Sequence, residues 1–205
     1  NLFMPRRSSA VDYRLNPIIS SVAAFHLLKQ NKMILKRWDL AVPAYNSGTK
    51  HLVKARRKFK KVKNLSLEYI LENYKHAHLG FASKNFYSEF LALVYVLAYK
   101  DKIYPLKGYS KEKHKFKTSK LNFYLTKCSI RPRKIEKLLK KLSPNHNLLN
   151  RQFRSKNRIF RRGSIIVSDV TLTKRKYKKV PDSIMKKYKP KHWVRKLRMK
   201  KCGKI

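Results

Sequence analysis

The balance of charge constrains this chain more than any other feature of its sequence. Fifty-three Lys and Arg residues stand against ten Asp and Glu residues among 205, which gives a formal net charge of +43. A compact fold with this charge repels itself strongly, so the chain needs a polyanionic partner. Nucleic acid is the expected polyanion, because phosphate contacts with Lys and Arg release counterions.

The composition also predicts a packed core. Hydrophobic residues make up 42% of the chain and aromatic residues 12%, which is more than a disordered basic tail usually holds. The positive charge is unevenly spread, since residues 107–205 hold 34 basic and 4 acidic residues whereas residues 64–105 hold four of each. We therefore expect an N-terminal arm at 1–15, a helical core at 16–105 with a basic loop at 50–63, a basic RNA-binding region at 106–184 and a basic C-terminal tail at 185–205.

Local capping signals predict the helices of the first half. Asn16 is a good N-cap and Pro17 suits a first helical position, so a helix is expected to begin there. Ser66 is expected to cap a short helix, and Ser83 to cap the most apolar helix of the chain. Because the apolar residues after Ser83 recur at helical spacing, we expect that helix to be the buried centre of the N-terminal half. Residues 38–49 contain Pro and Gly and are expected to form a loop.

The second half predicts two further helices and a hairpin. One helix is expected at about 119–127, and another from Pro132, where apolar residues recur at i, i+3, i+4 and i+7. Residues 164–167 are the clearest strand, with a turn at 168–169 and a return strand from Thr171. The expected fold class is mainly α with a small β-hairpin (α+β), in which a small helical core carries long basic extensions.

Catalysis needs convergent polar groups, and the ten carboxylates are scattered along the chain. Glu68 and Glu72 are interpreted as the solvated face of a helix. His76 and His78 have no cysteine or carboxylate cluster beside them, so no metal site is expected. The sequence therefore predicts no catalytic residue, no cofactor and no small-molecule substrate, and the chain is not expected to be an enzyme.

The cysteines and the apolar runs add two further expectations. Cys128 and Cys202 are too few for a disulfide framework or a four-ligand zinc site, and we interpret them as reduced thiols. No apolar run reaches the ~18–20 residues that span a membrane, so no membrane partner is expected.

Basic residues interleaved with aromatic ones are the strongest functional signal. Around Phe153 and Phe160, arginines recur every three or four residues and can contact phosphate bidentately or stack on exposed bases. The residues predicted to bind RNA are Arg6, Arg7, Arg56, Arg57, Lys58, Lys60, Lys61, Arg131, Arg133, Lys134, Lys137, Arg151, Arg154, Arg158, Arg161, Arg162, Lys174, Arg175 and Lys176.

Residues 120–184 carry a family resemblance. The runs at 120–125 and 128–139 resemble the helix–turn–helix half of the α-L RNA-binding motif, and Gly163-Ser164-Ile165-Ile166-Val167 resembles the strand that follows it. This motif occurs in the small-subunit ribosomal protein S-four family, in pseudouridine synthases and in some tRNA synthetases. The resemblance implies an insertion at about 143–162, and it implies rRNA contacts by Arg131, Arg133, Lys134 and Lys137.

These observations lead to one function hypothesis and two alternatives. The chain is expected to be a structural constituent of a mitochondrial ribosome, with rRNA and neighbouring ribosomal proteins as partners and the small subunit favoured. Its abundant Lys, Leu, Tyr, Phe, Ile and Asn also suit an AT-rich organellar genome. The alternatives are an organellar RNA-processing or intron-splicing factor and a basic DNA-packaging or viral nucleoprotein.

Overall fold

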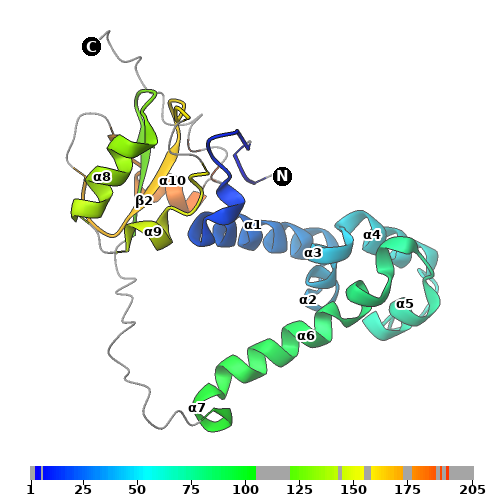
Figure 1. The fold of residues 1–205 in the computed structure, drawn as a ribbon. Helices are drawn as coiled ribbons and strands as arrows, with labels where there is room; N and C mark the ends of the chain where they lie inside the picture. Colours follow the sequence, from blue (N-terminus) through cyan, green and yellow to red (C-terminus); the bar gives the residue numbers. More distant parts are fainter. Residues whose placement is uncertain are drawn as a thin grey trace. The chain divides into compact units, whose positions relative to one another are not determined.

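The computed structural model describes residues 3–5, 7–104, 121–142, 145–154, 158–172, 177–187, 190 and 193. Contacts divide the chain into two compact units, which are described separately (Figure 1). Unit 1 comprises residues 1–26 and 116–205, and unit 2 comprises residues 27–115. The predicted α+β class is confirmed, because the structure is mostly helical with a small antiparallel sheet.

A three-stranded antiparallel sheet organises unit 1. Its strands are β1 (Asn122–Thr126), β2 (Ile165–Ser168) and β3 (Tyr177–Lys179), in the order β2-β1-β3. The helix expected at about 119–127 is therefore wrong. β1 is buried at four successive residues, and such a continuous apolar run does not distinguish a central strand from a short buried helix. The expected strand at 164–167 is confirmed within one residue, but the return strand pairs with β1 and not with β2.

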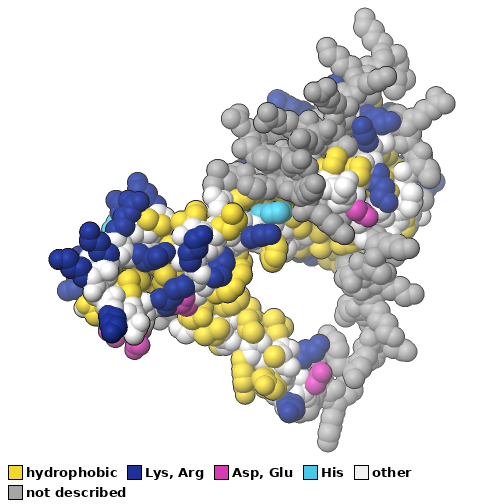
Figure 2. Space-filling model, turned by 180° about the vertical axis from the view of Figure 1, so that it is seen from behind, with side chains coloured by type: hydrophobic (Ala, Val, Ile, Leu, Met, Phe, Trp, Pro, Cys, Tyr) yellow, Lys and Arg dark blue, Asp and Glu magenta, His cyan; other side chains and the backbone are white. Residues whose placement is uncertain are grey.

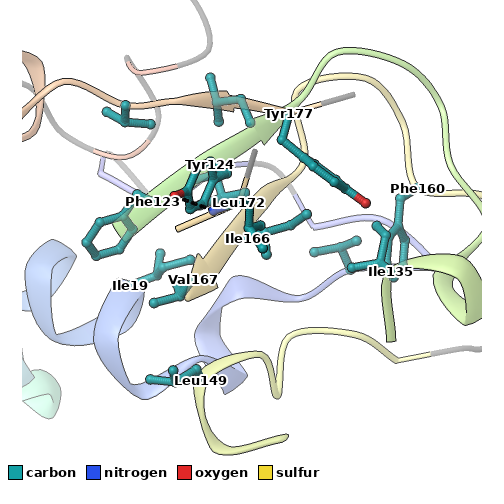
Figure 3. Close-up of a cluster of buried hydrophobic side chains, with 14 of the residues drawn as sticks. Ile19, Phe123, Tyr124, Ile135, Leu149, Phe160, Ile166, Val167, Leu172 and Tyr177 are labelled. Carbon is teal, nitrogen blue, oxygen red and sulfur yellow. Dashed lines mark hydrogen bonds between the residues drawn. The ribbon is translucent and has the colours of Figure 1, made fainter. Parts of the chain in front are cut away.

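Four short helical elements surround this sheet: η1 (Tyr13–Leu15), α8 (Pro132–Leu142), α9 (His146–Leu149) and α10 (Asp182–Lys187). The predicted helix from Pro132 is confirmed as α8, whose Ile135 and Leu139 are fully buried in the core of unit 1 (Figure 3). Trp193 closes the same core, with its ring edge-on to Phe123 at 5.1 Å between centroids. α8 thus packs its apolar face on the core and exposes its many Lys and Arg residues to solvent.

Side chains from other elements bond to β2, which lies at the edge of the described sheet. The Tyr13 hydroxyl accepts a hydrogen bond from the Ile165 amide at 2.9 Å, and the Gln152 amide donates to the Ile165 carbonyl at 3.1 Å. Asn150 bonds both the amide and the carbonyl of Val167, at 3.0 and 2.7 Å. An unpaired strand edge invites pairing with other chains, and these polar side chains satisfy it instead.

The helix α1 (Pro17–Leu35) begins in unit 1 where the sequence predicts it. Asn16 accepts a hydrogen bond from the Ile19 amide at 2.9 Å, as an N-cap does. Its own amide group donates to the Leu149 carbonyl at 2.5 Å and to the Gln152 side chain at 2.7 Å. Asn16 is completely buried, so the cap also ties the helix start to the polar network beside β2.

Unit 2 is helical. It contains the end of α1, α2 (Trp38–Ala41), α3 (Pro43–Ser47), α4 (Thr49–Lys58), α5 (Leu67–Asn73), η2 (Ala77–Leu79), α6 (Phe81–Ala98) and α7 (Lys100–Ile103). The expected loop at 38–49 is wrong, because Pro43 occupies the start of α3 and Gly48, with φ of +90°, separates α3 from α4. The short helix after Ser66 is confirmed, with the Tyr69 amide donating to the Ser66 hydroxyl at 3.0 Å.

The helix α6 is not the buried centre that the sequence predicts. Phe81 is 84% exposed and Leu97 61% exposed, and Figure 2 shows hydrophobic side chains along the surface of this arm of unit 2. α6 is apolar around most of its circumference, so it presents no single face that a small core could cover. Ser83 is not its cap either, since the helix begins at Phe81 and the Ser83 hydroxyl donates to the His78 carbonyl at 3.0 Å. Within the described ranges, no helix combines the length and apolarity required to cross a membrane.

Cys128 departs from expectation as well. It lies just after β1 and is disulfide-bonded, so the interpretation of this residue as a reduced thiol is wrong. Cys202 lies outside the described residues.

Candidate functional site: a basic pocket in unit 2

A pocket of about 640 Å³ lies within unit 2. Its described lining is divided between apolar and cationic side chains, with no acidic residue among them. The lining residues are Ile34, Leu40, Val53, Phe59, Val62, Leu65, Arg37, Arg56, Arg57 and Lys60. We call this feature the basic pocket.

One face of α4 supplies two cations of the basic pocket, Arg56 and Arg57. Leu52 and Ala55 of this helix are fully buried in the core of unit 2. The lining residues Val53, Arg56 and Arg57 follow at i, i+3 and i+4, which places them along one face of α4, and Lys60 lies just after the end of that helix. The core packing of α4 therefore fixes which of its many basic residues point into the pocket.

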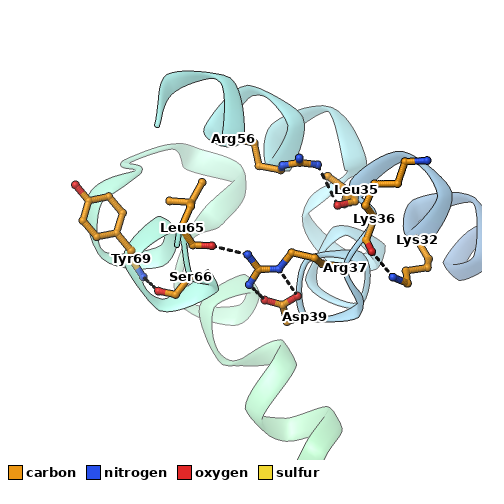
Figure 4. Close-up of polar contacts among 9 residues, drawn as sticks. All are labelled: Lys32, Leu35, Lys36, Arg37, Asp39, Arg56, Leu65, Ser66 and Tyr69. Atoms are coloured by element: carbon orange, nitrogen blue, oxygen red, sulfur yellow. Dashed lines mark hydrogen bonds and ion pairs between the residues drawn. The ribbon is translucent and has the colours of Figure 1, made fainter. Parts of the chain in front are cut away.

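Arg37 lines the pocket, and hydrogen bonds to Asp39 and Leu65 hold its guanidinium group (Figure 4). Its Nε donates to Asp39 Oδ1 at 3.0 Å, a second guanidinium nitrogen pairs with Asp39 Oδ2, and the third donates to the Leu65 carbonyl. The hydrogen bond to Asp39 raises the pKa of Arg37 above its ordinary value. Asp39 neutralises this cation and brings a carboxylate into contact with a residue that lines the pocket.

Arg56 is anchored differently. Its guanidinium donates to the carbonyl of Leu35 at 3.0 Å, at the C-terminal end of α1, where helix carbonyls lack a partner in the helix (Figure 4). One of its five N–H donors is used there, which leaves the others available toward the pocket. Arg57 and Lys60 are exposed, and their side chains have no hydrogen-bond or ion-pair partner among the described residues.

Phe59 forms an apolar wall of the same pocket. Tyr69 and Tyr74 meet its ring edge-on, with centroids 5.3 and 6.4 Å away. Lys58 lies 5.5 Å from the Phe59 centroid, within range of a cation–π contact. The pocket therefore combines an aromatic wall with cationic side chains.

Three histidines form a second cluster in unit 2, which we call the histidine cluster. The ring of His51 lies 4.5 Å from that of His76 and 4.4 Å from that of His78. Burial lowers the pKa of His51, and His78, His76, Lys54 and Lys50 lower it further. No group of His, Cys, Asp or Glu in the described part of the chain has the geometry to hold a metal ion. His51 could not have been linked to this pair from the sequence, because 24 intervening residues separate it from His76.

The structure places the predicted RNA-binding residues in both units. In unit 2, Arg56, Arg57 and Lys60 line the basic pocket, whereas Lys58 and Lys61 are exposed beside it. In unit 1, the cations of α8 and of the segment before β2 are exposed and spread over separate elements: Arg131, Arg133, Lys134, Lys137, Arg151, Arg154, Arg158, Arg161 and Arg162. The Nε atom of Arg7 lies 3.7 Å from Oδ2 of Asp12, within ion-pair distance. The remaining residues, Arg6, Lys174, Arg175 and Lys176, lie outside the described residues.

Part of the chain matches a known protein family. A family model described as the transglycosylase SLT domain matches residues 1–67, about a third of the chain. The match includes residues of both units, and every described residue that lines the basic pocket lies inside it. No curated protein matches the chain.

This match corrects the function expected from the sequence. The resemblance to the α-L motif and to the ribosomal protein S-four family is wrong, as is the mitochondrial ribosomal role with rRNA and ribosomal proteins as partners. The mitochondrial localisation, which depended on that role, is corrected with it. The expectation that the chain is not an enzyme is also wrong, since the matched domain is named for a transfer reaction. The physical error in the resemblance lies at 120–127, where the motif requires a helix and the structure has β1.

Proposed function

We propose that this chain is a transglycosylase-like protein that acts on the glycan strands of peptidoglycan. The observation that supports this function best is the position of the basic pocket, whose lining falls entirely within the residues that match the transglycosylase domain. A volume of about 640 Å³ suits a small-molecule or oligosaccharide unit.

The reaction needs a carboxylate beside the sugar. Transglycosylation breaks the bond between an anomeric carbon and its oxygen and forms a new bond from that carbon to an acceptor hydroxyl, whose proton ends on the leaving oxygen. The transition state carries positive charge on the sugar, which a neighbouring carboxylate stabilises. Asp39 is assigned this role, because it contacts Arg37 of the pocket and its side chain is 25% exposed.

Asp12 is the other carboxylate within the matched residues, and it suits the reaction less. The Arg14 side chain holds the pKa of Asp12 down at about 2, against the opposing effect of its burial. The carboxylate is therefore an ionised partner of Arg14, at 2.7 Å, in the fold of unit 1. Neither carboxylate lines the basic pocket, but Asp39 contacts Arg37, which does line it, whereas Asp12 belongs to unit 1.

The charge and the disulfide agree with this proposal. Peptidoglycan carries free carboxylates on its peptides, so it is a polyanion that offsets a chain of net charge +43. Disulfides persist in oxidising compartments outside the cytosol, where such a substrate is found, and Cys128 is disulfide-bonded.

The test compares two carboxylate variants of the full chain on purified peptidoglycan. Asp39→Asn is expected to lower the rate of release of soluble glycan fragments by about 100-fold or more, as the loss of a catalytic carboxylate does. Asp101→Asn, which removes a carboxylate from α7 of the same unit outside the match, is expected to retain the rate. Equal rates for Asp39→Asn and the unchanged chain, with both folded by circular dichroism, would sink the assignment.

A further inference from the structure

The cations of the basic pocket differ in how much of their bonding capacity the protein itself uses. Arg37 is bonded at three nitrogens and paired with Asp39, so it has little left for a ligand. Arg56 is anchored once, at the Leu35 carbonyl. No described carboxylate neutralises Arg57 or Lys60; Arg57 belongs to α4, Lys60 lies two residues after the end of that helix, and both line the pocket.

We infer that the basic pocket binds an oxyanion carried on a sugar ring, with Arg57 and Lys60 as its charged ligands and Arg56 as a fixed donor. Clustered cations without a lining carboxylate produce a positive potential that attracts an anion into the recess. The planar fork of Arg pairs bidentately with carboxylate or phosphate, and Lys adds a point charge. The identity of the polymer rests on the proposed function, but the preference for an oxyanion does not.

The apolar half of the lining selects the carrier of that charge. Phe59, Val53 and Leu65 offer no hydrogen bond from their side chains, so a fully hydrated ion would leave these walls uncovered. A pyranose ring has apolar C–H faces that can cover an aromatic ring, while its acidic substituent reaches the cations. The pocket thus fits an acidic sugar unit better than a neutral sugar or a free inorganic ion.

The binding test uses the full chain and monomer probes, so it requires no turnover. N-acetylmuramic acid and N-acetylglucosamine share a ring and differ in one carboxylate-bearing substituent, and N-acetylglucosamine 6-phosphate supplies the phosphate alternative on the same ring. Isothermal titration at fixed ionic strength is expected to show at least tenfold tighter binding of one of the two acids than of the neutral sugar. Whichever acid binds more tightly identifies the source of the oxyanion. Equal affinity for all three probes overturns the inference.

Matched variants locate the binding. Arg57→Gln combined with Lys60→Gln is expected to weaken binding of the acid about tenfold or more, because charge-assisted hydrogen bonds are lost. Lys100→Gln combined with Lys102→Gln removes the same charge from α7, outside the pocket, and is expected to leave the affinity unchanged. Equal weakening in both double variants would mean that only net charge matters and would overturn the inference.

Two further outcomes separate this inference from the proposed function. Selective binding of the acid without release of glycan fragments supports the pocket and contradicts the transglycosylase-like activity. Release of fragments with no preference among the probes supports the activity and contradicts the pocket. A short single-stranded RNA could also displace the acid, with an affinity that the Arg57 and Lys60 substitutions reduce. That result would assign the pocket to nucleic acid and overturn the inference that it binds an acidic sugar.

Discussion

Replacing Asn16 by Ala is expected to destabilise unit 1 severely, because this completely buried side chain makes three hydrogen bonds. Loss of an N-cap costs about 1 kcal/mol. The Leu149 carbonyl and the Gln152 side chain each lose a donor, and a buried acceptor left unsatisfied costs about 1–3 kcal/mol. The combined loss is roughly 3–7 kcal/mol, a large part of the 5–15 kcal/mol that typically stabilises a domain.

The assay is urea unfolding followed by Trp fluorescence. Trp193 is fully buried in unit 1 and Trp38 belongs to unit 2, so a Trp38→Phe background makes the signal specific for unit 1. Asn73→Ala is the matched control, because Asn73 is exposed and makes a single bond to the Tyr69 carbonyl at 3.0 Å. A loss below about 1 kcal/mol for Asn16→Ala would refute the claim that it joins the start of α1 to the network beside β2.

Three further predictions concern pH and exposure. The pKa of His51 is lower in the folded chain than its ordinary value of 6.5. Above pH 6.5 the His51 side chain is therefore mainly neutral in both the folded and the unfolded chain. Below pH 6.5 the unfolded chain takes up a proton at His51 before the folded chain does, so the free energy of unfolding should fall as the pH is lowered. Urea midpoints that stay constant down to pH 5.5, or fall equally in His51→Gln, would contradict this. The pKa of Asp12 is about 2, so its stabilisation is present above pH 3.8 and is lost as pH falls through 2; Asp12→Asn should remove that part of the acid unfolding curve. Leu97→Gln on exposed α6 should change the free energy of unfolding by less than about 0.5 kcal/mol, whereas Leu52→Ala in the core should lower it by about 2–5 kcal/mol. Comparable losses for the two variants in urea unfolding would mean that α6 is buried.

Local signals predicted the elements that local chemistry determines. The Asn16 cap, the Ser66 cap and the amphipathic face of α8 are read from a few neighbouring residues, and the structure has all three. β1 and α6 failed for a common reason. Neither the apolar run of β1 nor the helical spacing of apolar residues in α6 reports what surrounds the element, so the first proved to be a central strand and the second an exposed helix.

The candidate site depended on long-range contacts that no spacing reveals. The sequence singled out Arg56, Arg57 and Lys60 as polyanion ligands, and the structure places all three on one pocket. It gave no reason to add Phe59 or Leu65, which reach the pocket only through the fold of the α4–α5 connection. The sequence shows Arg37 and Asp39 as opposite charges two residues apart, but it does not show that this pair lies at a pocket.

The most direct test of the central claim is the mass spectrum of material released from purified peptidoglycan by the unmodified full chain. The account predicts soluble glycosyl fragments whose amount rises with protein concentration and time. Release no greater than in a protein-free control, from a folded chain at the same salt, would contradict it.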